Sequence, residues 1–298
     1  MRKLDFHADD YGVSINNSKR IIELIRSKRA DSISFIPNMG CFDECMSLLK
    51  DNWDSFEKKP LISIHLNLID GYRLSSKNSD EIQNNTWFEH FLRSLIPGSK
   101  KKALKEYFIS EISLQIKTVY DQICTLKDTD GNPVSLRIDS HVHTHSIPLV
   151  FDSLIEALKN LDLLDKTQYI RNPREPFLMF FTTKGVISRV PFINIIKNII
   201  LNVLGISVGK KLNRLGISSG IMWGLMMSGN MDVDRVNALL PKMNSLALKK
   251  DLHLEVLCHP GIVLEEEKRP EYGKDDLIAF FSKNRDVEYD MLMEHISV

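Results

Sequence analysis

Apolar, strand-like runs alternate along the chain with runs whose apolar residues recur at helical spacing. This alternation restricts the fold more than any other feature, because it favours parallel βα units over an all-β sandwich. The expected strands cover residues 3–8, 32–36, 61–66, 135–142, 168–171 and 253–258. The expected helices cover residues 18–28, 42–49, 104–126, 149–161 and 233–249. The sequence therefore predicts an α/β fold built on parallel strands.

Two long stretches interrupt the alternation. Residues 70–102 are polar and irregular around a short apolar patch, and residues 172–232 hold few clear strands. Excursions of this length often form lids or substrate walls. Because no repeat, low-complexity tract or long linker divides the sequence, we expect one domain over residues 1–298.

Three short clusters of acidic and histidine residues lie at or just beyond the ends of expected strands. They read His-Ala-Asp-Asp-Tyr-Gly at 7–12, His-Leu-Asn-Leu at 65–68 and Asp-Ser-His-Val-His-Thr-His at 139–145. Barrel and open α/β enzymes place their sites at the carboxyl ends of parallel strands. Buried carboxylates and imidazoles need partners that offset their desolvation, and a divalent metal ion is such a partner. The clusters therefore predict a metal-dependent hydrolase site.

The third cluster is the most specific of the three. In an extended strand, side chains alternate between the two faces, so the acidic and imidazole side chains of this cluster are expected to share one face. They are Asp139, His141, His143 and His145. Three histidines in such a row favour metal ligation over core packing. Asp139 is expected to accept the free N–H of a neighbouring imidazole and so fix its tautomer.

The first two clusters each have a competing interpretation. Asp9 and Asp10 would point in opposite directions at a strand end, so one can bind metal while the other accepts a proton. The alternative is a solvated surface pair. His65 taken alone is typical of a hydrogen-bonded core histidine, and it becomes a candidate ligand only in the company of the other clusters.

A further strand end carries His253-Leu254-Glu255-Val256-Leu257-Cys258-His259-Pro260-Gly261. A histidine held there by a rigid turn suits a general acid or an oxyanion donor, and a turn-capping histidine is the equal alternative. Arg171 ends another expected strand. It either holds a carboxylate in the site or closes a surface ion pair.

Charge and cysteine content restrict the partners and the compartment. The 39 Lys and Arg residues balance 39 Asp and Glu residues, so we expect no nucleic-acid partner and a neutral or weakly charged substrate. A strand that begins almost at the initiator Met leaves no room for a signal peptide, so a cytoplasmic location is expected. The four cysteines do not form a disulfide-dense pattern, and we expect them to be reduced.

The segment 190–208 is the most apolar stretch of the chain. Its polar residues at 194, 197, 198 and 202 recur at helical spacing, which predicts an amphipathic helix with one solvent-facing polar stripe. The segment is too short and too polar for a membrane span. Core packing, a lid or a subunit contact, including one in a homodimer, is favoured over attachment to a membrane surface.

Together the motifs resemble those of the YdjC-like carbohydrate deacetylase family, which includes the chitooligosaccharide deacetylases and the hopanoid-associated HpnK proteins. The resemblance rests on four motifs in the family's order and approximate spacing. They are Asp9-Asp10-Tyr11-Gly12, Ile64-His65-Leu66-Asn67-Leu68, Ile138-Asp139-Ser140-His141-Val142-His143 and Glu255-Val256-Leu257-Cys258-His259-Pro260-Gly261. The chain departs from the family at His7, where Asn is common, and in a longer, more apolar 172–232 segment.

The resemblance implies a deformed TIM-like (β/α) barrel in a single domain. It also implies a metal-dependent hydrolase that removes N-acetyl groups from an amino sugar or oligosaccharide and releases acetate. One divalent ion, Mg or Zn, would be bound by Asp10, His65 and His141.

Carried over by position, Asp9 would be the catalytic base and His259 the acid or transition-state donor. We expect Arg171 and Tyr11 to contact the substrate, with Tyr11 among the aromatic residues that could pack on a sugar ring. Two neighbours are expected to support the metal ligands: Asp139 and His143.

Two other functions remain open on the sequence. A phosphoesterase or amidohydrolase also uses an H-x-H strand, but such enzymes usually carry the motif on the first strand of the barrel, whereas here it lies at 141–143. A non-catalytic, sugar-binding or membrane-peripheral barrel is the second alternative, and the presence of Asp9 argues against it.

Overall fold

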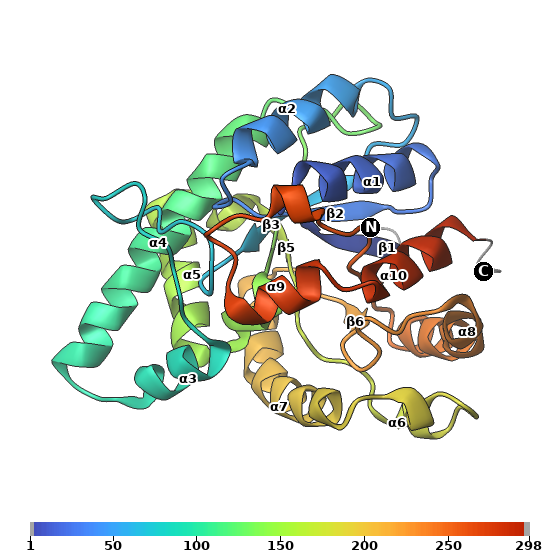
Figure 1. Ribbon diagram of the computed structural model, residues 1–298. Coiled ribbons are helices and arrows are strands. Elements are labelled where there is room, and N and C mark those ends of the chain that lie inside the picture. The colour runs from blue at the N-terminus through green and yellow to red at the C-terminus, as the bar shows by residue number, and fades with distance from the viewer. Residues whose placement is uncertain (1–2, 295–298) are drawn as a thin grey trace.

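Seven parallel strands form one sheet within residues 3–294, which the computed structural model describes apart from the side chains of residues 189 and 274–276 (Figure 1). The strands are β1 (Leu4–Tyr11), β2 (Ser32–Phe35), β3 (Leu61–Leu66), β4 (Leu136–Ser140), β5 (Thr167–Ile170), β6 (Ile221–Trp223) and β7 (Leu254–Cys258). Their order across the sheet is β5-β4-β3-β2-β1-β7-β6. All six predicted strands are present, and the predicted α/β class is confirmed.

The two edges of this sheet are joined by a short bridge. Tyr169 in β5 pairs in parallel with Ser218, which lies three residues before β6 begins. The Ser218 amide donates to the Gln168 carbonyl and the Ile170 amide donates to the Ser218 carbonyl, each at 3.1 Å. The sheet is therefore curled into a half-barrel, which confirms the barrel-like single domain expected from the sequence.

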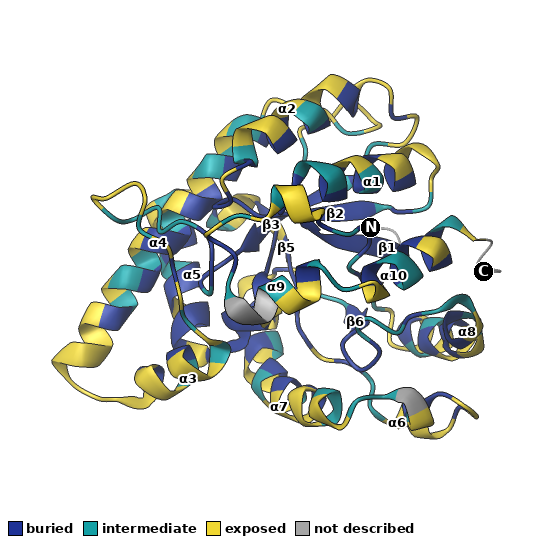
Figure 2. Ribbon diagram, viewed as in Figure 1, coloured by how far each residue is buried: buried dark blue, intermediate teal, exposed yellow. Residues whose placement is uncertain are grey.

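Helices cover the outside of the curled sheet, with buried inner faces and exposed outer faces (Figures 1 and 2). The five predicted helices are α1 (Ile15–Arg26), α2 (Phe42–Trp53), α4 (Ser99–Ile123), α5 (Pro148–Asn160) and α8 (Val233–Lys249). The others are α3 (Trp87–Leu95), α6 (Leu178–Phe181), α7 (Phe192–Leu215), α9 (Lys274–Phe280) and α10 (Asn284–Met293). Side-chain caps fix several starts, since Ser14 accepts from the Asn17 amide at α1 and Asp232 accepts from the Arg235 amide at α8.

The inside of the half-barrel is polar and closely hydrogen-bonded. His7 in β1 contacts Ser32 Oγ through Nδ1 and Ser34 Oγ through Nε2, both at 2.6 Å. Ser34 in β2 donates to Asp139 in β4 at 2.5 Å, and this contact passes over β3. Such a contact requires both side chains to lie on the concave face of the sheet. The alternate residues of these strands join the apolar core between sheet and helices.

Three elements differ from the sequence prediction. The strand predicted over 135–142 ends at Ser140, where a 3₁₀ turn begins. β6 was not predicted, because its three residues lie between glycines at 220 and 224 and are too few for a periodic signal. The helix expected over 190–208 extends to Leu215, where Gly216 ends it in a left-handed conformation.

Candidate active site at the carboxyl ends of the strands

Asp9 and Asp10 end β1 in a bulge. The register between β1 and β2 shifts between Ala8 and Tyr11, and Asp10 has a φ of 67°. Asp tolerates this left-handed conformation better than most residues that carry a side chain, and the bulge holds it there. The two carboxylates consequently have different partners, as predicted from their adjacent positions at a strand end.

The histidine-rich segment does not continue as a strand. Val142 and His143 both have left-handed backbones, with φ of 42° and 57°, so the chain turns sharply after His141. The expectation that all the acidic and imidazole side chains share one strand face is therefore wrong. His145 instead points back to Ser140, whose Oγ lies 2.5 Å from its Nδ1.

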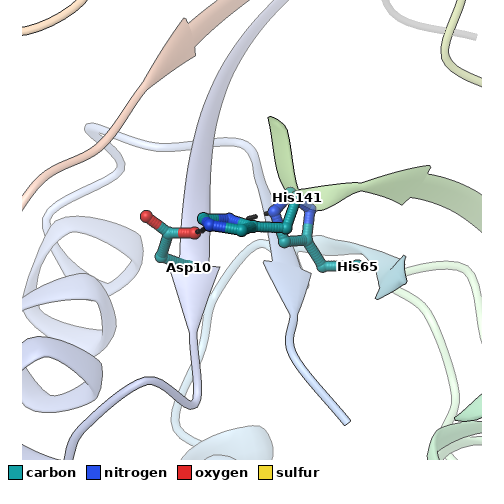
Figure 3. Close-up of side chains that lie close together, drawn as sticks. All are labelled: Asp10, His65 and His141. Atoms are coloured by element: carbon teal, nitrogen blue, oxygen red, sulfur yellow. Dashed lines mark ion pairs between the residues drawn. The ribbon is translucent and has the colours of Figure 1, made fainter. Parts of the chain in front are cut away.

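The three predicted metal ligands lie together at the carboxyl ends of β1, β3 and β4. His65 Nε2 is 3.6 Å from Asp10 Oδ1, and His141 Nδ1 is 3.4 Å from the same oxygen. Figure 3 shows the two imidazoles facing this carboxylate. All three residues are buried.

This trio fits a divalent cation. Metal–ligand bonds of about 2.1 Å at tetrahedral angles place ligand atoms about 3.4 Å apart, close to the separations found here. Among the described residues, Asp10 Oδ1 is buried and accepts no hydrogen bond. A buried carboxylate oxygen without a donor is costly unless a cation faces it. Asp10, His65 and His141 could therefore hold a metal ion.

Asp139 contacts one imidazole of this trio, and His143 is buried two residues after His141. Asp139 Oδ1 lies 2.6 Å from His65 Nδ1, which leaves Nε2 of that imidazole facing Asp10. Asp139 thus contacts an imidazole of the site in the manner predicted, although its partner comes from β3 instead of its own segment. Burial and the nearby Arg171 guanidinium hold the pKa of His143 well below its ordinary value, so this imidazole is neutral at pH 7.

The second oxygen of Asp10 is bound by Arg285 of α10. Arg285 also donates to the Gly261 carbonyl at 3.3 Å, which fixes the guanidinium against the loop after β7. Burial alone would raise the pKa of Asp10, but Arg285 and His141 hold it well below its usual range. Asp10 is therefore an anion with one oxygen held by protein and the other directed at the imidazoles.

Asp9 lies beside the trio in a different charge environment. Arg171 grips its two oxygens with Nη1 and Nη2 at 3.0 and 2.8 Å, and His7 Nε2 lies 3.0 Å from Oδ1. Burial alone would raise the pKa of Asp9, but Arg171, His65 and His7 hold it well below its usual range. The clamp leaves Asp9 ionised with a fixed carboxylate plane.

His259 follows β7 and is partly exposed, so it can reach a bound molecule. Its Nε2 lies 4.0 Å from Asp9 Oδ2. Its Nδ1 lies 3.6 Å from Glu288 of α10, whose carboxylate also accepts from the His259 amide at 2.5 Å. Burial alone would lower the pKa of His259, but Glu288, Asp10 and Asp9 raise it above its ordinary value.

Arg171 and Tyr11 are not placed to contact a substrate. The Arg171 side chain has no exposed surface and binds Glu255 and Asp139 in addition to Asp9. It therefore holds carboxylates inside the site, and the interpretation as a surface ion pair is wrong. Tyr11 is equally buried, donates to the Cys45 carbonyl at 2.8 Å, and belongs to the core.

Arg285 and Glu288 are the site residues that the sequence analysis missed. They lie three residues apart on a helix near the end of the described chain, where opposite charges at that spacing are typical of a solvated surface. Both are buried against the loop after β7. Only the docking of α10 against the barrel distinguishes them from an ordinary surface pair.

These features define a class: an α/β barrel with an acidic and imidazole cluster where its strands end. A family model described as YdjC-like protein matches residues 3–296. The chain therefore belongs to the YdjC-like family, and the resemblance found in the sequence is confirmed.

Two known proteins are similar to parts or all of this chain. A carbohydrate deacetylase of Clostridium beijerinckii is 26% identical over 157 residues, a match that covers 53% of this chain and 56% of the relative. A candidate cellobiose-phosphate cleavage protein of Enterococcus faecalis V583 has a crystal structure that aligns with a TM-score of 0.56 at 15% identity. That alignment covers 99% of this chain and 91% of the other, and it supports the TIM-like fold alone.

Proposed function

We propose that this protein is a metal-dependent carbohydrate deacetylase that hydrolyses the N-acetyl group of an amino sugar or oligosaccharide. The observation that carries the proposal is the convergence of Asp10, His65 and His141, with Asp9 and His259 on neighbouring strand ends. The similarity to a carbohydrate deacetylase over about half the chain supports it.

The residues divide the chemistry of amide hydrolysis among them. A divalent ion held by Asp10, His65 and His141 would polarise the acetyl carbonyl and acidify a water. Asp9 takes the proton from the attacking water as the new C–O bond forms. His259 donates a proton to the nitrogen as the C–N bond breaks, which releases acetate and the free amine. Arg171 and Glu288 keep this base and this acid in place.

The charge states favour this division of roles. Asp9 is ionised and can accept a proton, whereas the raised pKa of His259 keeps its donor form populated nearer to neutral pH. His259 Nε2 and Asp9 Oδ2 lie 4.0 Å apart, so one reacting amide can contact both side chains. General acids and bases placed in this way typically contribute about 10²–10⁴-fold each to the rate.

Acetate release is the direct test. The purified protein is incubated with a panel of N-acetylated sugars and oligosaccharides in the presence of Mg, Zn, Mn or Co, and acetate is measured. We expect release from at least one sugar that depends on the ion, with Mg or Zn as our proposed natural metals. Turnover of a phosphate ester without release of acetate from any sugar would instead favour the phosphoesterase alternative.

A further inference from the structure

Helix α7 is packed with its polar side inward. Asn198 donates to Glu175 Oε2 at 2.8 Å, Asn202 donates to the Glu175 carbonyl at 3.0 Å, and Asn194 donates to the Met226 carbonyl at 3.3 Å. Asn198 is fully buried. The polar stripe therefore lies largely on the inner side of α7 and attaches the helix to the barrel. The helix itself was predicted correctly, but the prediction that its polar stripe faces solvent is wrong.

The packing of this inner stripe is close and specific. A Cβ at Gly205 would lie 2.3 Å from Arg174 Cγ and 2.7 Å from Asn172 Oδ1, so only glycine fits there without a shift. Glu175, which receives Asn198, also accepts from three successive backbone amides after β6. These contacts fix the rotation of α7 about its own axis.

The opposite side of α7 presents large apolar residues to solvent, as the exposed outer surface of this helix in Figure 2 shows. We call this surface, with the adjoining α6, the α6–α7 face. Its members are Leu178, Phe181, Phe192, Ile193, Ile196, Ile199, Ile200, Val203 and Ile206. Phe192 is 75% exposed, Leu178 72% and Val203 62%. Large apolar residues exposed at helical spacing in this way mark an interaction site.

The segment that forms the α6–α7 face carries charge of one sign. Between Glu175 and Asp232 the sequence contains no acidic residue and six basic ones: Lys184, Arg189, Lys197, Lys210, Lys211 and Arg214. The whole chain has a net charge of zero, so this basic segment is a local feature. On α7 the apolar stripe continues at helical spacing from Ile206 to Lys210 and Arg214, both exposed.

Acidic groups of α5 neutralise part of this charge, because Asp152 and Glu156 line one pocket with Lys211 and Arg214 of α7. Asp152 of α5 pairs with Lys211, and Glu156 of α5 pairs with Lys105 of α4. Lys197 and Lys210 are exposed on α7 itself. The α6–α7 face therefore combines an apolar centre with a basic margin, which is the pattern of helices that lie in the headgroup region of anionic membranes.

We propose that the α6–α7 face binds the surface of an anionic lipid bilayer, with α7 lying in the plane of the interface. The expectation that the segment 190–208 is too short and too polar to span a membrane is wrong for the longer helix α7, which by length and composition alone could cross one. Its asparagine stripe attaches it to the barrel, however, so we infer that it lies on the bilayer instead of crossing it. A two-fold dimer through the same face would bring the two basic margins together. Charge complementarity thus selects an anionic membrane over a second copy of this chain.

Vesicle flotation with the full chain tests this proposal. Vesicles of phosphatidylcholine alone are compared with vesicles that also contain phosphatidylglycerol, and the bound fraction is measured. We expect binding to the anionic vesicles, lost in Val203→Asp and Ile196→Asp. The double variant Lys210→Glu, Arg214→Glu should weaken binding by about fivefold for each basic residue removed, or more because each change also adds an acid.

A matched control uses Leu114→Asp on α4, because Leu114 and Ile196 are each 38% exposed and undergo the same change of charge. This control should bind vesicles as the unchanged protein does, and circular dichroism should show all variants folded. Equal binding by the unchanged protein and Ile196→Asp would overturn the proposal. A protein that does not bind the anionic vesicles would also overturn the proposal. If that protein forms a dimer that Val203→Asp dissociates, the α6–α7 face is instead a contact between two copies of this chain.

Discussion

At the scale of single residues, the two adjacent carboxylates at the end of β1 have different surroundings. Asp10 faces two imidazoles, while Asp9 is gripped by Arg171. A backbone bulge with a left-handed residue produces this separation within two successive positions. In the proposed function, the same amino-acid type would therefore serve as metal ligand and as proton acceptor in one site.

This division predicts different losses on substitution. Asp9→Asn should keep the metal and lower kcat for acetate release by about 10²–10⁴-fold, because it removes the proton acceptor. His141→Ala should lose the ion, because one of three ligands is gone. Metal content measured by mass spectrometry beside the rate distinguishes the two. Equal metal loss in both variants would show that the roles of Asp9 and Asp10 have been assigned wrongly.

Glu288 should control the pH range of the reaction. The raised pKa of His259 keeps this group protonated to higher pH than an ordinary histidine, and the rate should fall as pH rises through that pKa. Glu288→Gln removes the carboxylate that raises the pKa, so the high-pH limb of kcat/KM should move to lower pH. Asp286→Asn on the same helix, which breaks a surface pair with Arg20, is the control and should leave the profile unchanged.

At the scale of elements, α7 depends on Glu175. This carboxyl group is buried, and burial raises its pKa to about 7 despite its donors, among them the Gly224 and Met226 amides. Its hydrogen bonds connect α7 to the segment after β6. The attachment of α7 to the barrel therefore depends on Glu175, a carboxyl group that titrates close to neutral pH.

Glu175 should make the free energy of unfolding depend on pH. Its folded pKa lies above the unfolded value, so the unfolded state releases its proton first as pH rises from about 4.5 to 7. Stability should fall across that range by up to about 3 kcal/mol. Glu175→Gln should flatten this slope, as measured by urea unfolding at several pH values, whatever its effect on absolute stability. An unchanged slope would show that Glu175 is not the titrating group.

The helices and strands also show which parts of the structure could be predicted from the sequence. Strands and long helices were predictable because apolar periodicity depends on local sequence, and the motifs identified the strand ends. The left-handed turn at Val142 and His143 was not predictable, because it begins at Val142, a β-branched residue that strongly disfavours that conformation. The inward stripe of α7 was also hidden, since its central residue, Asn198, is buried against Glu175, which lies 23 positions earlier in the chain. In both places the conformation depends on contacts with residues that are distant in the sequence.

At the scale of the whole molecule, the trio of Asp10, His65 and His141 links three strands of one sheet. An ion bound there should stabilise the folded barrel by about 2.7 kcal/mol at a hundredfold excess over its dissociation constant. For a chain of 298 residues that corresponds to a rise in Tm of about 4 °C. Chelation should reverse the rise, and His65→Ala should abolish it in differential scanning calorimetry. A metal-induced rise that survives in His65→Ala would place the ion elsewhere.

The bridge between Tyr169 and Ser218 has a consequence for assembly. Open strand edges invite other chains to add strands, and proteins with exposed edges must protect them. Here the edge strands β5 and β6 have four and three residues, and the bridge occupies part of the backbone between them. Within the described chain, little strand backbone is left to pair with a neighbour. Association of this protein with other molecules should therefore use its helical surfaces and not extension of its sheet.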